Sequence, residues 1–269
     1  MKLIEMNSGR LIKNLLREDV EDVSKLLGLV LNKSQEQLFA NLDYELKSTE
    51  FEKFLSLTGE RKSGKPFAYI KGSQGFYDLD FIVSPSTLIP RPETELLIDI
   101  AIEKLDPEKK LKVLDLGTGS GIIAITLSEK CPKWEISATD CSSEALSIAK
   151  LNANREIDFY RGSWFEPLPH KKFDLIISNP PYISQKDPHL EDLSFEPMEA
   201  LVSGNDGLKD IKLIISKSPQ YLNKGGLLIL EHGYNQKDRI VNLLVQSFKN
   251  IKTFTDLNKV DRAILAELR

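Results

Sequence analysis

The sequence predicts an α/β fold in which a doubly wound, mostly parallel seven-stranded sheet follows a small N-terminal helical domain. From residue 111 onward, apolar runs of strand length alternate with helical patterns, as is typical of a parallel sheet covered by helices on both faces. Before residue 64 the apolar residues recur at helical spacing instead, which indicates a helical bundle. We therefore expect a helical domain at 1–70, a linking β-hairpin at 71–88 and a sheet domain at 89–269.

The N-terminal domain is predicted to contain short amphipathic helices, with breaks near Asp19, Asn32 and Ser48. Residues at helical spacing should form its core; they are Leu11, Ile12, Leu15, Leu16, Val23, Leu26, Leu27, Val30, Phe51, Phe54, Leu55 and Leu57. Two glycines, Gly72 and Gly75, then precede the strand-like segment 76–83. This arrangement predicts the hairpin that links the two domains.

Seven runs are candidate strands of the sheet. Five of them alternate with helical patterns and should be parallel: 111–116, 135–140, 157–161, 173–178 and 226–231. The last two, 251–257 and 262–268, are joined by only a few residues. Because parallel neighbours need a long crossover connection, these two should form an antiparallel hairpin.

Composition limits the class of protein. The chain has 269 residues, 41% of them apolar, but no run approaches the roughly 18 apolar residues that a membrane span needs. Two cysteines, Cys131 and Cys141, fit a reducing compartment and match no metal motif. His170, His189 and His232 are scattered, so we expect loop or surface histidines and no metal site. The net charge of −4 argues against a broad phosphate-binding surface, and a cytoplasmic protein is expected.

A glycine-rich turn follows the first strand of the sheet domain and consists of Gly117, Thr118, Gly119, Ser120 and Gly121. Such a turn lets the backbone approach a ligand closely. Asp140 ends the next strand, where an acid accepts the hydroxyl groups of a ribose. The spacing is not that of a dinucleotide site, and Asp115 would repel phosphate but suit an ammonium group. S-adenosylmethionine therefore fits this pattern better than NAD.

A second turn, Asn179-Pro180-Pro181-Tyr182, follows the apolar run 173–178. Prolines cannot donate a backbone hydrogen bond, so they end the strand and stiffen the turn. The turn presents two acceptors, the Asn179 side-chain oxygen and the Pro180 carbonyl, together with the ring of Tyr182. These groups suit a planar NH2 with two hydrogens, and both turns should open onto the same edge of the sheet.

The chain resembles the release-factor glutamine methyltransferases, the PrmC/HemK family, over essentially its whole length. The segments that carry the resemblance are Lys65–Ile70, Thr87–Glu95, Asp115–Gly121, Asn179–Ile183, Glu196–Leu201 and Gly204–Leu208. The resemblance implies a Rossmann-like methyltransferase domain that uses S-adenosylmethionine. It also implies a substrate in translation termination, the glutamine of the Gly-Gly-Gln motif in peptide chain release factors. The helical domain would then recognise this protein substrate.

The same resemblance implies roles for individual residues. Residues 117–121 would hold the methionine end of the cofactor, Asp140 its ribose and Trp164 its adenine. Residues 179–182 would bind the glutamine, with Asn179 also beside the cofactor and with Asn179, Pro180 and Tyr182 as the catalytic set. The sequence itself favours a structural role for Pro90–Glu93, where Arg91, next to Glu93, would clamp the catalytic turn or pair at the domain junction; a supporting part in shaping the cofactor pocket comes second. Glu231, after the fifth strand, could be catalytic by position, but a structural role in the loop at the end of the sheet is expected.

Three alternatives use the same residues. A nucleic-acid methyltransferase acting on adenine N6 or guanine N2 shares the Asn-Pro-Pro-Tyr turn, but it predicts a basic groove. The narrower segment Pro90–Glu95 favours the glutamine methyltransferases over it. A non-catalytic adaptor would not need the intact glycine turn and Asn-Pro-Pro-Tyr turn, so their presence argues against it. The spacing of the glycines argues against a nicotinamide dehydrogenase. We therefore expect no direct nucleic-acid or membrane partner.

Overall fold

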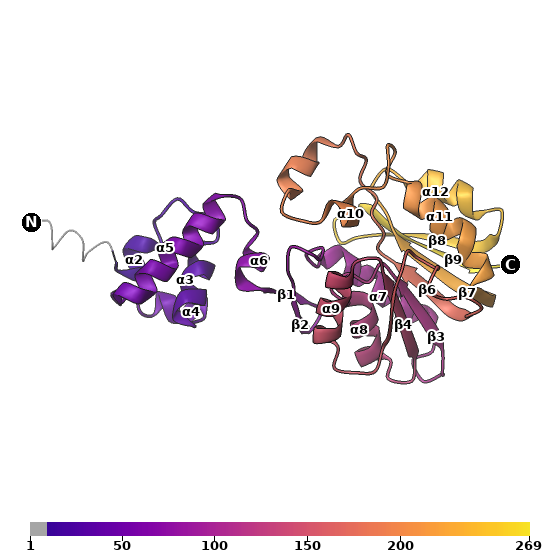
Figure 1. Ribbon diagram of the computed structural model, residues 1–269, viewed down its shortest axis with the longest axis horizontal. Helices are drawn as coiled ribbons and strands as arrows, with labels where there is room; N and C mark the ends of the chain where they lie inside the picture. The colour runs from indigo at the N-terminus through magenta and orange to yellow at the C-terminus, as the bar shows by residue number, and fades with distance from the viewer. Residues whose placement is uncertain (1–9) are drawn as a thin grey trace, which may run out of the picture. The chain divides into compact units, whose positions relative to one another are not determined.

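The computed structural model describes residues 10–269 and divides into two compact units, Met1–Gly72 and Ser73–Arg269. The first unit is helical, and its elements are α2 (Ile12–Leu15), α3 (Val23–Leu31), α4 (Gln35–Phe39), α5 (Ser48–Lys62) and α6 (Phe67–Lys71) (Figure 1). Its core is a single apolar cluster of Ile12, Leu15, Leu26, Leu27, Leu38, Leu46 and Phe54. The predicted breaks are confirmed at Asn32, which ends α3 in a left-handed conformation, and at Ser48, where α5 begins.

Leu55 departs from the predicted helical core. Its side chain is 53% exposed, whereas Phe54 is buried. Each helical residue turns by about 100°, and the buried side of α5 is centred on Phe54 and Thr58. The small bundle covers only this narrow stripe of α5, which leaves Leu55 at its edge.

The second unit begins with the hairpin β1 (Ser73–Phe76) and β2 (Leu79–Ile82) and continues as an α/β domain. Its helices are η1 (Pro92–Thr94), α7 (Glu95–Lys104), α8 (Ile122–Lys130), α9 (Ser143–Asn152), η2 (Pro188–Leu193), α10 (Met198–Leu201), α11 (Lys209–Lys217), η3 (Ser218–Gln220) and α12 (Lys237–Leu244). Its larger sheet contains β3 (Lys112–Leu116), β4 (Glu135–Asp140), β5 (Asp158–Arg161), β6 (Phe173–Ser178), β7 (Leu222–Glu231), β8 (Phe248–Thr255) and β9 (Asp261–Leu268).

The seven strands lie in the order β5-β4-β3-β6-β7-β9-β8. The first five are parallel, and β9 is antiparallel to both β7 and β8, so the predicted mixed sheet and its C-terminal hairpin are confirmed. Strand β8 begins three residues before the predicted start. Phe248, which is fully buried, pairs with Leu268 and anchors that end of the strand.

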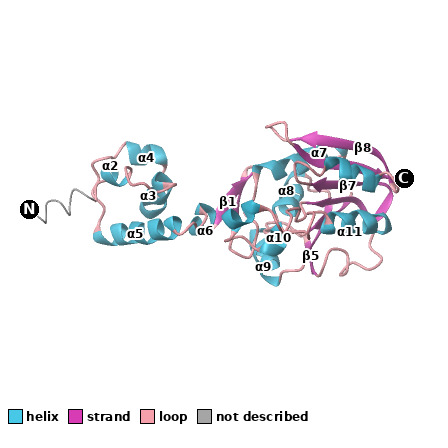
Figure 2. Cartoon of the chain, turned by 90° about the horizontal axis from the view of Figure 1, so that it is seen from above, coloured by secondary structure: helices cyan, strands magenta, loops and turns pink. Residues whose placement is uncertain are grey.

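Helices cover both faces of this sheet (Figures 1 and 2). Alternate residues of one strand explain this: Val113 of β3 packs in a core with α7 and α8, whereas Leu114 packs with α11 and α12. Successive side chains of a strand point to opposite faces, so apolar residues at both positions require two helical layers. The result is a three-layer α/β/α domain.

The parallel strands end at one edge of the sheet, where the connecting segments form the site described below. The register places Leu116 beside Thr139 and Ser178, and Ser178 beside Leu230. The residues that follow β3, β4, β6 and β7 are therefore brought together, although they are up to about a hundred residues apart in sequence. Within residues 10–269, no helix has the length and apolar character that crossing a membrane would require.

Candidate active site

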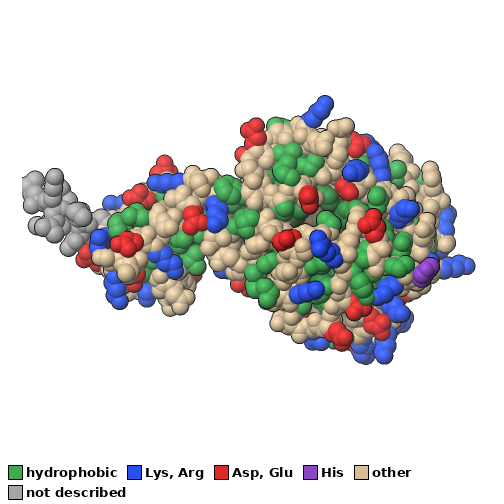
Figure 3. All heavy atoms as spheres, viewed as in Figure 1, with side chains coloured by type: hydrophobic (Ala, Val, Ile, Leu, Met, Phe, Trp, Pro, Cys, Tyr) green, Lys and Arg blue, Asp and Glu red, His purple; other side chains and the backbone are tan. Residues whose placement is uncertain are grey.

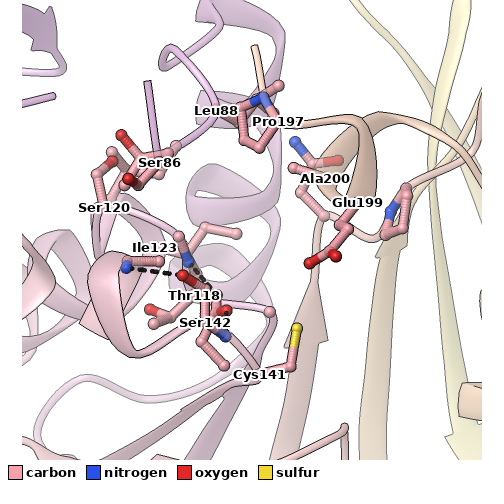
Figure 4. Close-up of a pocket in the computed structure, with 18 of the residues that line it drawn as sticks. Ser86, Leu88, Thr118, Ser120, Ile123, Cys141, Ser142, Pro197, Glu199 and Ala200 are labelled. Atoms are coloured by element: carbon pink, nitrogen blue, oxygen red, sulfur yellow. Dashed lines mark hydrogen bonds between the residues drawn. The ribbon is translucent and has the colours of Figure 1, made fainter. Parts of the chain in front are cut away.

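A cavity of about 460 Å3 lies in the second unit and is lined by the segments that follow β3, β4, β5 and β6. Segments 86–91 and 197–200, together with Thr94 and Asp210, complete its wall. Figure 4 shows Thr118 and Ser142 on one side, with Pro197 and Ala200 across from them. Of the predicted cofactor residues, those that line the cavity are Gly117, Thr118, Gly119, Ser120, Asp140, Trp164 and Asn179.

Gly121 has a different place from the other glycines of the turn. It does not line the cavity, and a Cβ atom there would lie 2.5 Å from Cδ1 of Ile125. Its φ of 91° is also in the left-handed region, which favours glycine. Gly121 therefore allows the turn to enter α8 with close packing, which is a structural requirement.

Asp115 is fully buried and does not line the cavity. Its Oδ2 atom accepts hydrogen bonds from the Thr118 hydroxyl (2.6 Å) and the Ala124 backbone N–H (3.3 Å). Its other oxygen has no hydrogen-bond partner among the described residues, and burial raises the pKa of Asp115 to about 7. The expected contact between Asp115 and a ligand ammonium group is therefore replaced by an internal role: Asp115 ties the turn to the start of α8.

Asp140 ends β4 at the cavity wall. Its Oδ2 atom accepts from the Gly119 N–H (2.8 Å) and its Oδ1 atom from the Ser142 N–H (2.9 Å). Burial raises the pKa of Asp140, although these backbone bonds oppose the shift. Each carboxylate oxygen has a further lone pair, so Asp140 can still accept two ligand hydroxyl groups.

Trp164 supplies a flat apolar wall. It has a φ of 47°, a conformation that is uncommon outside glycine. Its ring is partly buried, and a Cβ atom on Gly117 would lie 3.3 Å from its Cζ3 atom. The glycine therefore leaves room for the ring beside the turn.

The charged side chains around the cavity are mostly acidic. Carboxylates come from Asp140, Glu144, Glu199 and Asp210, whereas Arg91 is the one cation among the lining residues. In Figure 4 the Glu199 carboxylate points toward the side of the cavity that holds Cys141. Arg91 itself forms an ion pair with Glu196, so the cavity favours a cationic ligand.

This ion pair gives Arg91 a partner that the sequence does not indicate, because Glu196 lies 105 residues further along the chain. Glu196 is buried and accepts both from the Arg91 guanidinium and from the Ile89 N–H (2.9 Å). A buried carboxylate requires such partners. The pair holds segment 89–91 against segment 196–201.

The Asn-Pro-Pro-Tyr turn separates two cavities. Ser178, just before it, donates from its hydroxyl to the Leu116 carbonyl (2.7 Å) and fixes the end of β6 against β3. A second cavity of about 210 Å3 contacts Pro180 and Tyr182. Pro181, which sequence reasoning assigns to the substrate, lines only the larger cavity. The residues that line both cavities are Leu88, Arg91, Asn179 and Ala200.

Tyr182 is held at both ends. Its carbonyl oxygen accepts from Nε2 of the buried residue Gln236 (3.0 Å). Its hydroxyl donates to Oε1 of Glu231 (3.1 Å), and burial beside this carboxylate raises the pKa of Tyr182. The ring is therefore fixed at the wall of the smaller cavity.

Two further residues, Thr94 and Glu231, contact the site, although the sequence alone assigns a catalytic role to neither of them. The Asn179 side-chain nitrogen donates to the Thr94 hydroxyl (3.0 Å), which in turn donates to Oε2 of Glu231 (2.8 Å). Thr94 and Glu231 are fully buried. For Glu231 the sequence favours a structural role in a loop over the catalytic role that its position would also allow. The one sequence signal for it is an acid at the end of an otherwise apolar strand.

The histidines take no part in the site. His170 and His189 are exposed, and His232, although buried, lies in the loop that follows β7. Its Nδ1 atom lies 2.8 Å from the Gly233 carbonyl, and burial lowers its pKa. In the described part of the chain, no group of three His, Cys, Asp or Glu side chains is arranged to hold a metal ion.

Models of known protein families match segments in both units of the chain. Residues 6–72 match the family model of the PrmC N-terminal domain, and residues 94–196 match that of the methyltransferase small domain. A solved Thermus thermophilus 16S rRNA methyltransferase, RsmC, in complex with AdoMet and guanosine, is similar with a TM-score of 0.56. It is 18% identical, and the match covers 73% of this chain and 50% of that one. At this identity the similarity concerns the fold alone.

Two curated relatives are much closer in sequence. The release factor glutamine methyltransferase of Coxiella burnetii is 42% identical over 250 residues, covering 91% of this chain and 90% of that protein. The release factor glutamine methyltransferase of Vibrio cholerae is 40% identical over 259 residues, covering 92% and 89%. The resemblance stated from the motifs is confirmed: this chain belongs to the release factor glutamine methyltransferase family.

Proposed function

We propose that this protein methylates the side-chain amide nitrogen (N5) of the glutamine in the Gly-Gly-Gln motif of peptide chain release factors, using S-adenosylmethionine. Family membership supports the reaction class and the protein substrate. The observation that carries the proposal is the position of Asn179, which lines both the larger and the smaller cavity. Asn179 can therefore contact a group bound in the larger cavity as well as a group bound in the smaller one.

The larger cavity fits S-adenosylmethionine. Its volume of about 460 Å3 lies in the range of ligand sites, and Gly117 and Gly119 bring backbone close to it. Asp140 can accept ribose hydroxyl groups, and Trp164 offers a face for adenine. The mostly acidic lining suits a ligand that carries a sulfonium and an ammonium group. When bound there, S-adenosylmethionine supplies an electrophilic methyl group.

The residues of the turn have to activate a poor nucleophile. The lone pair of an amide nitrogen is delocalised into its carbonyl, the resonance that gives peptides a rotation barrier of roughly 18–20 kcal/mol. The Asn179 side-chain oxygen and the Pro180 carbonyl would accept the two substrate N–H bonds. Both acceptors favour the positive charge that develops on nitrogen during attack. Tyr182 would pack on the amide plane and orient it.

Proton removal needs no dedicated base in this scheme. The amide nitrogen becomes strongly acidic once it carries the methyl group, so its proton can leave to water. The acids that do line the larger cavity are Asp140, Glu144, Glu199 and Asp210. We assign them to binding of the cationic methyl donor.

A protein substrate is favoured over a nucleic acid. Residues 73–269 carry a net charge of −5, with 24 Lys or Arg and 29 Asp or Glu. Acidic and basic side chains are interspersed on the face of this unit shown in Figure 3. Duplex binding instead depends on many Lys and Arg contacts to phosphate. We propose that nucleic acid is not a direct partner.

The helical unit would help to seat the release factor. Among residues 10–72 it exposes the large apolar side chains of Phe39 (58%), Leu42 (37%) and Leu55 (53%). Exposed apolar groups are common at protein interfaces. Replacing Phe39 by serine should raise KM for the release factor several-fold and leave kcat unchanged.

The decisive experiment is incubation with a purified release factor and a methyl-labelled donor, followed by peptide mapping. We expect label on the glutamine of the Gly-Gly-Gln motif. Asn179→Ala should abolish turnover while cofactor affinity, measured by calorimetry, stays within about twofold. Label on RNA or DNA alone, or full activity of folded Asn179→Ala, would rule out the proposed reaction.

A further inference from the structure

A buried chain of hydrogen bonds connects the catalytic turn to the end of the neighbouring strand. Asn179 Nδ2 donates to Thr94 Oγ1 (3.0 Å), and this hydroxyl donates to Glu231 Oε2 (2.8 Å). Asn179 directly follows β6, Glu231 ends β7, and the register pairs Ser178 with Leu230. The two side chains therefore emerge at the same edge of the sheet, and Thr94 bridges them.

Thr94 does not use its hydroxyl for the helix that follows it. It precedes α7, a position at which threonine commonly caps the first turn, but its side chain makes no capping hydrogen bond. Instead, the hydroxyl bonds to residues 85 and 137 positions away in sequence. The helix start thus positions Thr94 toward the active site.

Glu231 is an unfavourable residue for stability alone. It is fully buried, and this burial raises its pKa to about 7. The hydroxyl groups of Thr94 and Tyr182 and the charge of Arg262 favour its ionised form, whereas Glu93 opposes it. A leucine or glutamine could fill the same space without a buried charge. A carboxylate at this place requires another explanation.

We infer that Thr94 and Glu231 are positioning residues that determine which end of the Asn179 amide faces the substrate. The ionised Glu231 carboxylate only accepts hydrogen bonds, so in that form the single hydroxyl hydrogen of Thr94 is directed to Glu231. Thr94 then offers Asn179 a lone pair and must receive the Asn179 NH2 group. The Asn179 oxygen is left for the substrate.

The opposite orientation would block the reaction in the proposed function, on which this inference rests. A flipped Asn179 would point its own NH2 at the NH2 of the substrate glutamine. Its oxygen would face the Thr94 oxygen with no hydrogen between them. Since such unpaired buried groups are costly, the chain selects one orientation. The second oxygen of Glu231 holds the Tyr182 hydroxyl, so one carboxylate sets two groups of the turn.

The first test compares Thr94→Val with Thr94→Ser. Valine has nearly the shape of threonine but no hydroxyl, whereas serine keeps the hydroxyl. We expect Thr94→Val to lower kcat by about tenfold to 100-fold. The affinity for S-adenosylmethionine should change much less, because valine keeps the shape of the residue at the wall of the larger cavity. Thr94→Ser should keep most of the activity. Thr126→Val is the matched control, because Thr126 is buried in α8 and its hydroxyl has no partner among the described residues.

The second test reverses the direction of the chain. Asn179→Asp places a second carboxylate beside the Thr94 hydroxyl group, whose single hydrogen can bond to only one of the two. This variant should lose turnover. Adding Glu231→Gln lets the introduced NH2 group donate to Thr94, so that the hydroxyl hydrogen can point to the carboxylate introduced at position 179. The kcat of the double variant should therefore be at least about tenfold higher than that of Asn179→Asp alone. In the wild-type background, by contrast, Glu231→Gln should lower kcat. Absence of recovery in a folded double variant would overturn the inference.

A third readout does not depend on activity. The side-chain NH2 of Asn179 can be observed by NMR after labelling with 15N-asparagine and assigned by its loss in Asn179→Asp. We expect its exchange with water to be at least about tenfold faster in Thr94→Val than in Thr126→Val. Equal exchange, or wild-type kcat in Thr94→Val, would refute the positioning role. A wild-type enzyme that leaves glutamine unmethylated would refute the proposed function instead.

Discussion

A Cβ atom on Gly207 would lie 2.2 Å from the carbonyl oxygen of Tyr182. The same carbonyl accepts a hydrogen bond from Gln236, which also donates to the Gly207 carbonyl (3.2 Å). Gly207 and Gln236 thus enclose the backbone of the turn at residues 179–182 from outside the cavities. Their contacts explain why a glycine lies in segment 204–208, whose role is not evident from sequence.

Gly207→Ala should displace Tyr182 and lower both stability and kcat. The new methyl group would overlap backbone, and a φ of 69° adds strain, so we expect a loss of roughly 2–4 kcal/mol in unfolding free energy. Gly225→Ala is the control, since its φ is 76° but its nearest atom, in the Glu267 side chain, is 3.7 Å away. Equal effects of the two substitutions on urea unfolding would show that the contact with Tyr182 is unimportant.

Removal of Arg91 should lower the free energy of unfolding, because the buried Glu196 carboxylate would lose its charged partner. Arg91→Ala is expected to destabilise the protein by about 2 kcal/mol, less than the 3–5 kcal/mol of a fully buried pair, because the Arg91 side chain is 33% exposed. The double variant Arg91→Ala/Glu196→Gln should regain most of this loss. The glutamine introduced at position 196 keeps an oxygen for the Ile89 N–H and carries no charge. If the effects of the two single substitutions on thermal unfolding simply add up in the double variant, Arg91 and Glu196 are not coupled.

Asp140→Ala should weaken cofactor binding without affecting the release-factor site. It removes the acceptor for ligand hydroxyl groups and for the Gly119 N–H, so calorimetry should give at least about a tenfold loss of affinity for S-adenosylmethionine. KM for the release factor should stay the same. Asp158→Ala, at an exposed position of β5, serves as the control. Unchanged cofactor affinity in Asp140→Ala would remove this residue from the site.

Asp115 should make stability depend on pH. Its pKa is about 7 in the folded protein, against 3.8 for an unperturbed group, so the unfolded state loses its proton first as the pH rises. Stability from this residue is therefore present below about pH 4 and is lost as the pH increases toward 7. The full shift is on the order of 4 kcal/mol. Urea unfolding should show the stability of Asp115→Asn rising relative to the wild type between about pH 4 and pH 7, and a constant difference would contradict the buried, raised pKa.

Several features of the fold follow from the sequence because they depend on local patterns. The seven strands are readable from apolar runs, and Asn32 and Ser48 mark helix boundaries. The turn at 117–121 and the turn at 179–182 are also recognisable, since glycine and proline restrict the backbone locally. Leu55 shows the limit of this reasoning, because helical spacing defines a face but not how much of it the neighbours cover.

The sequence by itself determined the parallel sheet, its two helical layers and the turns that line the cavities, because strand periodicity and backbone chemistry act over a few residues. Only the tertiary structure decided that Glu196 pairs with Arg91 and that Glu231 and Thr94 hold Asn179. It also decided that Asp115 lies behind the turn and that Gly207 meets Tyr182. These contacts join residues many positions apart, and their partners depend on strand register and on the packing of the segments around the sheet edge.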